Sequence, residues 1–314
     1  MARSKSTFVI NIEYYLVRGL ATLLGLLPER WAQSLAYVTL RCVLFFIPKR
    51  RELMRSNIAR AFPDLRSRQH KAIARESLAN LARGTAMFVR MPQILSRKDP
   101  PWLHIEGVTY LEKALQAGKG ALPITAHYGF WELMSSWTLK SYPKVSAVYR
   151  PLDNPRIDTF VKEIRCSGGG SMMDRRDVLR QALRWLKQNG VLGFLIDQNF
   201  AAGGVFVNFF GRPAATTPAI SILARRTGAA ILPVHNRWEG KTLRIIWEKP
   251  LVLSRHTDPE RAVAEDTQAM TSIVERWVRE EPGQWLWLHN RWKRQALPGE
   301  EIRSIGTDGG SALP

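Results

Sequence analysis

The chain has 314 residues, of which 46 are Lys or Arg and 27 are Asp or Glu, so its formal net charge is +19 at pH 7. Its apolar content of 45% and charged content of 23% are typical of a folded globular protein and exclude a disordered or fibrous chain. Two cysteines exclude a disulfide scaffold, and the excess of positive charge indicates an acidic partner such as nucleic acid, anionic lipid or an acidic protein.

Residues 1–48 are predicted to anchor the chain to a membrane. The apolar segments 8–27 and 31–47 are interrupted by charged residues, and a charge at the centre of a spanning helix costs about 2.5–3.5 kcal/mol on insertion scales. We therefore expect an uncleaved anchor that either spans the bilayer once or lies in its interface, with a pair of buried core helices as the alternative. Basic residues follow this region more densely than they precede it, so the positive-inside rule puts the rest of the chain in the cytoplasm.

Three further regions follow the anchor. Residues 49–98 predict a basic helical segment, and residues 298–314 predict a flexible, glycine-rich tail. Residues 99–297 alternate short apolar runs with amphipathic stretches, which predicts an α/β domain with a mostly parallel sheet flanked by helices. Strands are predicted at 102–107, 120–127, 145–150, 191–197, 229–238 and 243–253. Helices are predicted at 108–118, 155–170, 175–190, 217–228 and 259–282.

Several common functional motifs are absent from the sequence. It has no GxSxG, no GxxxxGK[ST], no GxGxxG after a strand and no HExxH. These absences argue against a serine hydrolase of the α/β type, a P-loop nucleotide site, a dinucleotide site and a zinc peptidase. We expect no metal and no organic cofactor.

The segment 125–132 follows a predicted strand and precedes a predicted helix. On a regular helix, side chains five residues apart point about 140° apart, so His127 and Glu132 can meet only if the chain bends between them. Gly129 allows such a bend. Glu132 would then accept a hydrogen bond from Nδ1–H of His127 and leave Nε2 as a base, which suits direct attack by a substrate hydroxyl. The alternative is a capped helix beside a histidine without a role.

The stretch GKGALPITAHYGFWELM at 118–134 resembles the first motif of the bacterial late lipid A biosynthesis acyltransferases, which include lauroyl and myristoyl transferases. This family belongs to the lysophospholipid acyltransferase superfamily, whose mark is His-x4-Asp/Glu. Phe130 stands where the family usually has asparagine. Further stretches are similar in order and spacing: YRPLDNP at 149–155, LGFLIDQN at 192–199, residues 204–234, and QWLWLHNRWK at 284–293.

The resemblance implies an O-acyltransferase of lipid A and lipopolysaccharide biosynthesis. A fatty acyl group would pass from acyl–acyl carrier protein, or from acyl-CoA, to a hydroxyl of a lipid A precursor glycolipid without a covalent acyl-enzyme. His127 would act as the general base, and Glu132 would hold its tautomer and stabilise the imidazolium. The enzyme would lie at the bacterial inner membrane with its catalytic domain on the cytoplasmic side.

Six further residues are predicted to bind substrate: Arg150, Asp197, Gln198, Phe210, Gly211 and Arg212. The arginine of the YRP stretch would bind a phosphate or a carbonyl, or else lie in a surface turn. The Asp-Gln pair at the end of a strand would position the acceptor sugar or support the His127 loop, or have a structural role. The Phe-Gly-Arg stretch would contact the pantetheine or acyl chain of the donor, or else form a bulged strand with a core phenylalanine.

Other functions remain as competing hypotheses. The same chemistry could act on a phosphatidylinositol mannoside, an ornithine lipid or a lysophospholipid. A non-catalytic basic protein that binds membranes or nucleic acid is a different class. The pair His127 and Glu132, together with the ordered motifs, favours the enzyme because a binding protein needs neither. The positive charge then serves the acidic carrier protein, the acceptor phosphates and the anionic inner leaflet, and no nucleic acid partner is expected.

Overall fold

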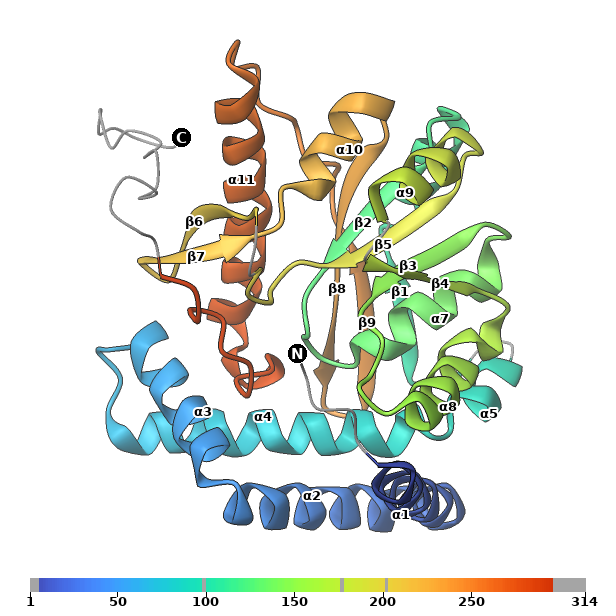
Figure 1. The fold of residues 1–314 in the computed structure, drawn as a ribbon, viewed down its shortest axis with the longest axis vertical. Helices are drawn as coiled ribbons and strands as arrows, with labels where there is room; N and C mark the ends of the chain where they lie inside the picture. Colours follow the sequence, from blue (N-terminus) through green and yellow to red (C-terminus); the bar gives the residue numbers. More distant parts are fainter. Residues whose placement is uncertain (1–5, 98–99, 176–177, 201–202, 296–314) are drawn as a thin grey trace.

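The structure, a computed structural model, describes residues 6–97, 100–175, 178–200 and 203–295 (Figure 1). Its centre is a seven-stranded sheet in the order β1-β9-β8-β2-β5-β3-β4. The pairing of β8 with β9 is antiparallel and the other pairings in this sheet are parallel, so the predicted α/β fold with a mostly parallel sheet is confirmed. Its strands are β1 Leu103–Glu106, β2 Ala121–Thr125, β3 Val145–Tyr149, β4 Ser171–Asp174, β5 Val191–Leu195, β8 Ala230–Glu239 and β9 Thr242–Trp247.

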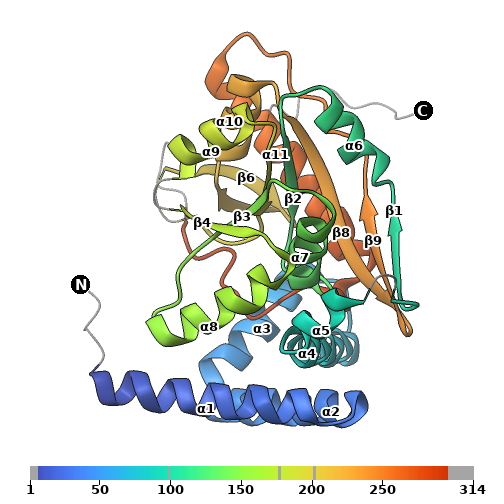
Figure 2. The ribbon, with the colours of Figure 1, turned by 90° about the vertical axis from the view of Figure 1, so that its right-hand side faces the viewer.

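Helices pack on both faces of this sheet (Figure 2). Along β2, Leu122 and Ile124 contact the helices of one face while Ala121 contacts those of the other, as the period of two in a strand requires. The first face carries α9 Val178–Lys187, α10 Ala219–Thr227 and α11 Pro259–Glu280. The second carries α6 Thr109–Gln116 and α7 Trp131–Ser141, beside which lie α8 Pro155–Arg165 and the short helix η1 Cys166–Gly168.

A hairpin of β6 (Val205–Phe209) and β7 (Arg212–Thr216) forms a second, two-stranded sheet. It packs against α11. After α11, the short helix η3 (Pro282–Gln284) starts a tryptophan-rich segment that folds back towards β2. The predicted tail, residues 298–314, lies outside the described residues.

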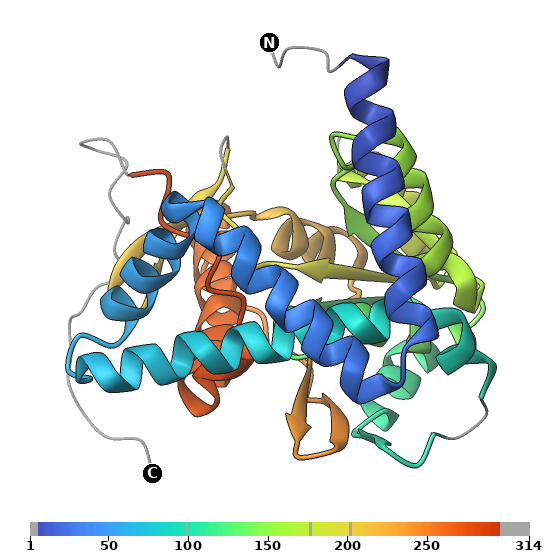
Figure 3. The same ribbon diagram turned by 90° about the horizontal axis from the view of Figure 1, so that it is seen from below.

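The N-terminal helices form a layer below the sheet (Figures 1 and 3). The helices α1 and α2 are outermost, and α4 lies between them and the sheet, where small side chains such as Ala36 and Ala86 allow close packing. Within the described residues α1 alone is long and apolar enough by itself to cross a bilayer. Only 11% of its 18-residue apolar stretch is buried. The helices of this layer are α1 Thr7–Leu26, α2 Glu29–Phe46, α3 Pro48–Ala61, α4 Ser67–Phe88 and α5 Met91–Ser96.

Candidate active site

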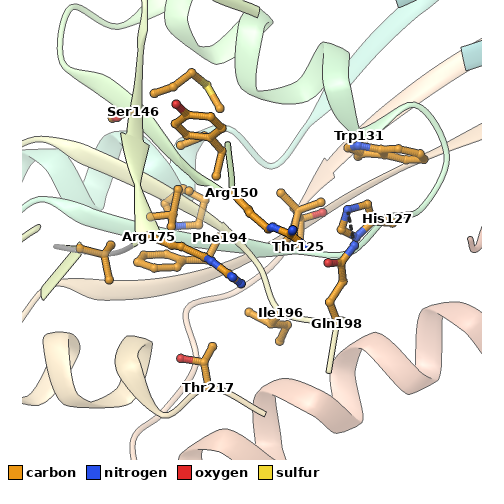
Figure 4. Close-up of a pocket in the computed structure, with 18 of the residues that line it drawn as sticks. Thr125, His127, Trp131, Ser146, Arg150, Arg175, Phe194, Ile196, Gln198 and Thr217 are labelled. Atoms are coloured by element: carbon orange, nitrogen blue, oxygen red, sulfur yellow. Dashed lines mark hydrogen bonds between the residues drawn. The ribbon is translucent and has the colours of Figure 1, made fainter. Parts of the chain in front are cut away.

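The site forms beyond the carboxyl end of β2. His127 follows this strand and lines a cavity of about 1030 Å³ (Figure 4). Residues from β2, β3 and β5 line the same cavity, together with residues of α7 and α9. The carboxyl edge of a parallel sheet is the usual place for a site in α/β proteins. The fold therefore puts the predicted histidine on the wall of a large cavity.

The imidazole of His127 is held by a buried carboxylate. Its Nδ1 lies 2.8 Å from Oδ1 of Asp197, and its backbone N–H donates to Oδ2 of the same side chain at 2.9 Å. The indole Nε1–H of Trp285 also donates to this Oδ2, at 2.7 Å. Asp197 is 4% exposed, so these three donors replace the water that the carboxylate would otherwise bind.

Burial alone would raise the pKa of the Asp197 carboxyl. The charge and hydrogen bonds of His127, with the bond from Trp285, outweigh burial and lower this pKa to about 2. An ionised carboxylate accepts only, so Nδ1 of His127 carries the proton and Nε2 is the free acceptor. The side-chain amide nitrogen of Gln198 lies 3.1 Å from this Nε2, which fits the same tautomer.

The predicted bond between Glu132 and Nδ1 of His127 is wrong. Glu132 accepts two hydrogen bonds from Arg165 of α8, at 2.8 and 2.6 Å, while Asp197 holds Nδ1. The reason is the start of α7 at Trp131, which places the Glu132 side chain in the first helical turn, beside α8. Glu132 and Arg165 still line the cavity. Burial opposes ionisation of Arg165, but the bonds and charge of Glu132 raise the pKa of Arg165 above its ordinary value.

The register between two strands explains why Asp197 is the partner. The parallel strands β2 and β5 pair with Thr125 opposite Leu195, and Ile196 N–H donates to the Thr125 carbonyl at 3.0 Å. His127 and Asp197 each lie two residues beyond that pair, so the strands deliver both side chains to the same edge. Asp197 therefore supports the His127 loop, which was one of its predicted roles, and it does not line the cavity as a sugar-binding group would.

Gly129 makes the sharp bend between the histidine and α7, as predicted. Its φ is +60°, and a Cβ on it would lie 2.2 Å from the backbone oxygen of Asn236. The Asn236 side chain on β8 accepts a hydrogen bond from Phe130 N–H at 2.5 Å. Only glycine fits this approach, so the loop after His127 is pinned against β8.

Arg150 and Gln198 line the cavity together with His127 and Glu132. Arg150 is exposed and donates to Asp153 at 3.0 Å, so it is a rim residue whose guanidinium faces solvent. Gln198 reaches His127 itself. The structure thus brings four of the predicted site residues to one cavity, and Figure 4 labels three of them, His127, Arg150 and Gln198.

The Phe-Gly-Arg stretch lies elsewhere. Phe210 and Gly211 have φ of 55° and 72° and form the two-residue turn of the β6–β7 hairpin. Phe210 is 6% exposed, its ring packs against Phe62 and Trp287, and its N–H donates to Glu275. These residues and Arg212 do not line the cavity, so the structure does not support the predicted contact with the acyl donor. It supports the alternative, in which the phenylalanine belongs to the core.

Residues 1–294 match the family model described as bacterial lipid A biosynthesis acyltransferase. The chain belongs to this family. The lipid A biosynthesis lauroyltransferase of Escherichia coli (strain K12) is 27% identical over 299 residues, which are 92% of this chain and 94% of the relative. The palmitoleoyltransferase of the same organism is 27% identical over 261 residues, 80% of this chain and 81% of the relative. The protein is therefore an O-acyltransferase, as the resemblance implied.

Two more distant similarities extend the comparison. A phosphatidylinositol mannoside acyltransferase of Mycolicibacterium smegmatis is 25% identical over 260 residues, 82% of this acyltransferase and 84% of the relative. Among solved structures, the 1-acyl-sn-glycerophosphate acyltransferase PlsC of Thermotoga maritima matches with a TM-score of 0.37 and 13% identity, over 79% of this chain and 95% of that one.

The contact between the C-terminal segment of this acyltransferase and the His127 loop was not predicted from the sequence. Gly129 N–H donates to the Gln284 carbonyl and Leu286 N–H donates to the His127 carbonyl, both at 2.9 Å, so the segment pairs with the His127 loop on either side of Trp285. The stretch QWLWLHNRWK was noticed only as part of the family resemblance. Its density of tryptophans was the available signal, because so many large rings in a short segment require burial.

Two polar residues of the same segment support the loop after β5. Arg291 is 1% exposed and donates to the carbonyls of Gln198 and Ala215, at 3.3 and 2.8 Å. Burial lowers the pKa of Arg291 to about 10, although the charge of Asp197 opposes this effect. His289 Nε2 accepts from Asn199 N–H at 3.0 Å. Burial, with smaller contributions from nearby charges, lowers the pKa of His289 to about 4.

Within the described ranges, no three His, Cys, Asp or Glu side chains are grouped so that they could hold a metal ion. The polar groups at the site are an imidazole, a buried carboxylate and an ion pair on the cavity wall.

Proposed function

We propose that this acyltransferase moves a fatty acyl group from a thioester donor, acyl–acyl carrier protein or acyl-CoA, to a hydroxyl of a lipid A precursor glycolipid. The observation that carries the proposal is His127 on the cavity wall, with its Nδ1 bonded to the buried carboxylate of Asp197 behind it. Asp197 fixes the proton on Nδ1, so Nε2 is unprotonated and can take a proton from a substrate hydroxyl that replaces the Gln198 amide beside it.

The proposed reaction needs no protein nucleophile. The acceptor oxygen attacks the thioester carbonyl while Nε2 of His127 takes its proton, and a C–O bond forms. The tetrahedral intermediate then expels the thiolate as the C–S bond breaks, and the imidazolium returns the proton to sulfur. Asp197 stabilises the transient imidazolium, and its low pKa keeps it ionised throughout.

The apolar part of the cavity is the proposed site of the acyl chain. Five apolar side chains of its wall lie on the α7 face of the sheet: Met134, Val145, Val191, Val234 and Trp247. Ligand sites commonly combine such an apolar wall with few polar groups at one end. Here the polar end is the one with His127, so an acyl chain bound along the apolar wall would present its carbonyl to the base.

The charged groups of the cavity have proposed roles around that reaction. Glu132 and Arg165 form an ion pair that joins α7 to α8 and so holds the wall beside His127. Arg150 on the rim suits a phosphate of the acceptor or donor. The proposed location is the cytoplasmic face of the bacterial inner membrane, where both substrates would meet.

A second acceptor is supported by the phosphatidylinositol mannoside acyltransferases among the relatives. They match this chain at identities close to those of the lipid A enzymes, 25% and 27% against 27%. The base and the cavity would serve either acceptor, because both offer a hydroxyl on a membrane glycolipid.

The test is acyl transfer in membranes that carry the full chain. Labelled acyl–acyl carrier protein and acyl-CoA are each offered with a tetra-acylated, Kdo-bearing lipid A precursor or with a phosphatidylinositol mannoside. We expect transfer to the lipid A precursor, and a loss of about 10²–10⁴-fold in His127→Ala, the usual range for removal of a general base.

The matched control is His104→Ala, which changes an exposed histidine on β1 and should leave the rate unchanged. An unchanged rate in His127→Ala would sink the proposed mechanism. Transfer to the phosphatidylinositol mannoside alone would replace the proposed acceptor and keep the mechanism.

A further inference from the structure

The outer faces of α1 and α2 are unusually apolar. Residues at helical spacing on α1 are exposed, namely Phe8, Ile12, Leu16, Leu23 and Leu26. On α2, Trp31, Val38 and Phe45 are spaced seven residues apart and are 70%, 55% and 68% exposed. Each helix thus carries a stripe of large apolar side chains on the side away from the protein. Exposed stripes of this kind mark an interaction surface.

The two helices lie in one plane. In Figure 2 both run along the underside of the molecule, and in Figure 3, seen from below, both lie in front of the remaining helices and strands. Only Leu27 and Pro28 separate them. The stripes therefore belong to one layer, whose inner side is covered by α4 and α8.

Three polar groups of α1 are hydrogen-bonded to the start of α8. The side-chain amide of Asn154, at the start of α8, donates to the Ile10 carbonyl at 2.9 Å and to the Glu13 carboxylate at 3.0 Å. Arg156 donates to Asn11 at 2.8 Å. One long side of α1 is therefore tied to a polar helix of the α/β domain while its opposite side is apolar.

The Arg18 guanidinium, midway along α1, adds a further tie to α8. It lies 4.5 Å from the centre of the Phe160 ring. A helix tied to α8 over residues 10–18 cannot cross a bilayer without taking α8 with it. That helix carries the ion pair of Lys162 and Asp158, which hydrocarbon would strip of water.

From this arrangement we infer that α1 and α2 lie flat in a single leaflet of the membrane as one platform, and that neither crosses the bilayer. The occupant of the exposed faces is lipid, and the basic start of α3, with Lys49 and Arg50 exposed, favours an anionic surface. Amphipathic helices of this kind lie with the apolar face about 5–10 Å into the boundary of headgroups and acyl chains.

The platform also places the cavity at the membrane surface. The rim segment Arg150–Asp153 leads directly into Asn154, which is bonded to α1. A lipid in the same leaflet would thus reach the cavity past α1. The inference on the platform itself does not depend on the proposed reaction.

The experiment measures the depth of nitroxide labels in vesicles of phosphatidylethanolamine and phosphatidylglycerol. Phe8→Cys, Leu16→Cys and Leu26→Cys are made in the full chain with Cys42 and Cys166 replaced by serine, and each label's accessibility to oxygen and to a water-soluble nickel complex gives its depth. A flat helix predicts one common depth for the three labels. A spanning helix rises 1.5 Å per residue, so its labels would differ in depth by about 12 Å and 15 Å in succession.

Two matched labels complete the test. A label on the native Cys42, which is exposed on α2 close to Phe45, should share the depth of the α1 labels. A label at Lys187 on α9, at the opposite end of the molecule in Figure 1, should stay in water. A depth that passes through the bilayer centre along α1 would overturn the inference. So would labels whose accessibility does not change when vesicles are added, since the stripes would then contact protein or solvent.

Discussion

At the scale of single residues, the two acidic side chains of the site have different partners. Asp197 is buried and holds the imidazole, while Glu132 holds Arg165 on the cavity wall. The spacing predicted that Glu132 orients the imidazole, and the family resemblance implied that it also stabilises the imidazolium. The distinction has a kinetic consequence, because only the residue bonded to Nδ1 sets the tautomer of His127.

Asp197→Asn should lower kcat by about 10³–10⁴-fold, because the amide can donate to Nδ1 and so favour the tautomer with the proton on Nε2. Glu132→Gln should cost less, since it leaves the Nδ1 bond intact and weakens only the ion pair with Arg165. The acyl-transfer assay with purified protein measures both. The reverse order of losses would mean that Glu132 orients the base in the working enzyme.

We expect His289 to make the free energy of unfolding sensitive to acid. Its folded pKa is about 4, below the value of about 6.5 expected in the unfolded chain, so the unfolded state takes up the proton first as the pH falls. The free energy of unfolding should therefore decline between about pH 6.5 and pH 4, by about 1–3 kcal/mol since the group is only partly buried.

His289→Gln keeps an acceptor for Asn199 N–H and removes the titration, so its thermal stability should change less over this range. His104→Gln, at an exposed site, should retain the full slope of the parent protein. Equal slopes in the parent and in His289→Gln would show that other groups cause the acid sensitivity.

At the scale of elements, the turn between β2 and α7 depends on one glycine. Gly129→Ala combines a φ of +60° with a Cβ 2.2 Å from the Asn236 oxygen, whereas Gly118→Ala has a similar φ of +72° and nothing within 4 Å. Gly118→Ala should lower the free energy of unfolding only by the backbone strain, about 1–2 kcal/mol, which corresponds to a Tm lower by about 2–8 °C. Gly129→Ala should lower Tm clearly more and abolish acyl transfer. Equal Tm values in the two variants would show that the loop relaxes around the clash.

The elements themselves were largely predictable and their pairing was not. The apolar runs around Ile124, Phe194 and Ile231 indicated the central strands β2, β5 and β8 correctly, because burial on both faces leaves a local signature. The four-residue β4 was missed, since so short a strand after a glycine run carries little pattern. The β6–β7 hairpin was missed because its turn uses Phe210 at positive φ, where a glycine or asparagine would have marked it.

The site was predictable only in its local part. The motif identified His127 and its position after a strand, which the structure confirms. The partner Asp197 is 70 residues away, and the register that joins it to His127 is a property of two strands together. The same holds for Trp285, which is 88 residues from Asp197 and reaches it through a folded-back segment.

At the scale of the whole molecule, the formal charge of +19 suits the two acidic partners of our proposal, an anionic membrane and an acidic donor protein. In that proposal the lower end, with α1 and α2, faces lipid. The upper end carries α9, where Arg180 lines the cavity and Arg184 and Lys187 are exposed beside it (Figure 1). A basic surface near a cavity accelerates encounter with an acidic partner, and salt screens this effect.

If acyl carrier protein is the donor, kcat/KM for acyl–acyl carrier protein should fall by about tenfold or more between low and high salt, because steering depends steeply on ionic strength. The charge-reversed double variant Arg180→Glu, Arg184→Glu should lose a similar factor at low salt and become nearly insensitive to salt. Arg255→Glu reverses an exposed arginine that does not line the cavity and should keep the parent's salt dependence. Losses of equal size in the two charge-reversed proteins would mean that the charge acts through the membrane surface or the acceptor, and that α9 is not where the donor docks.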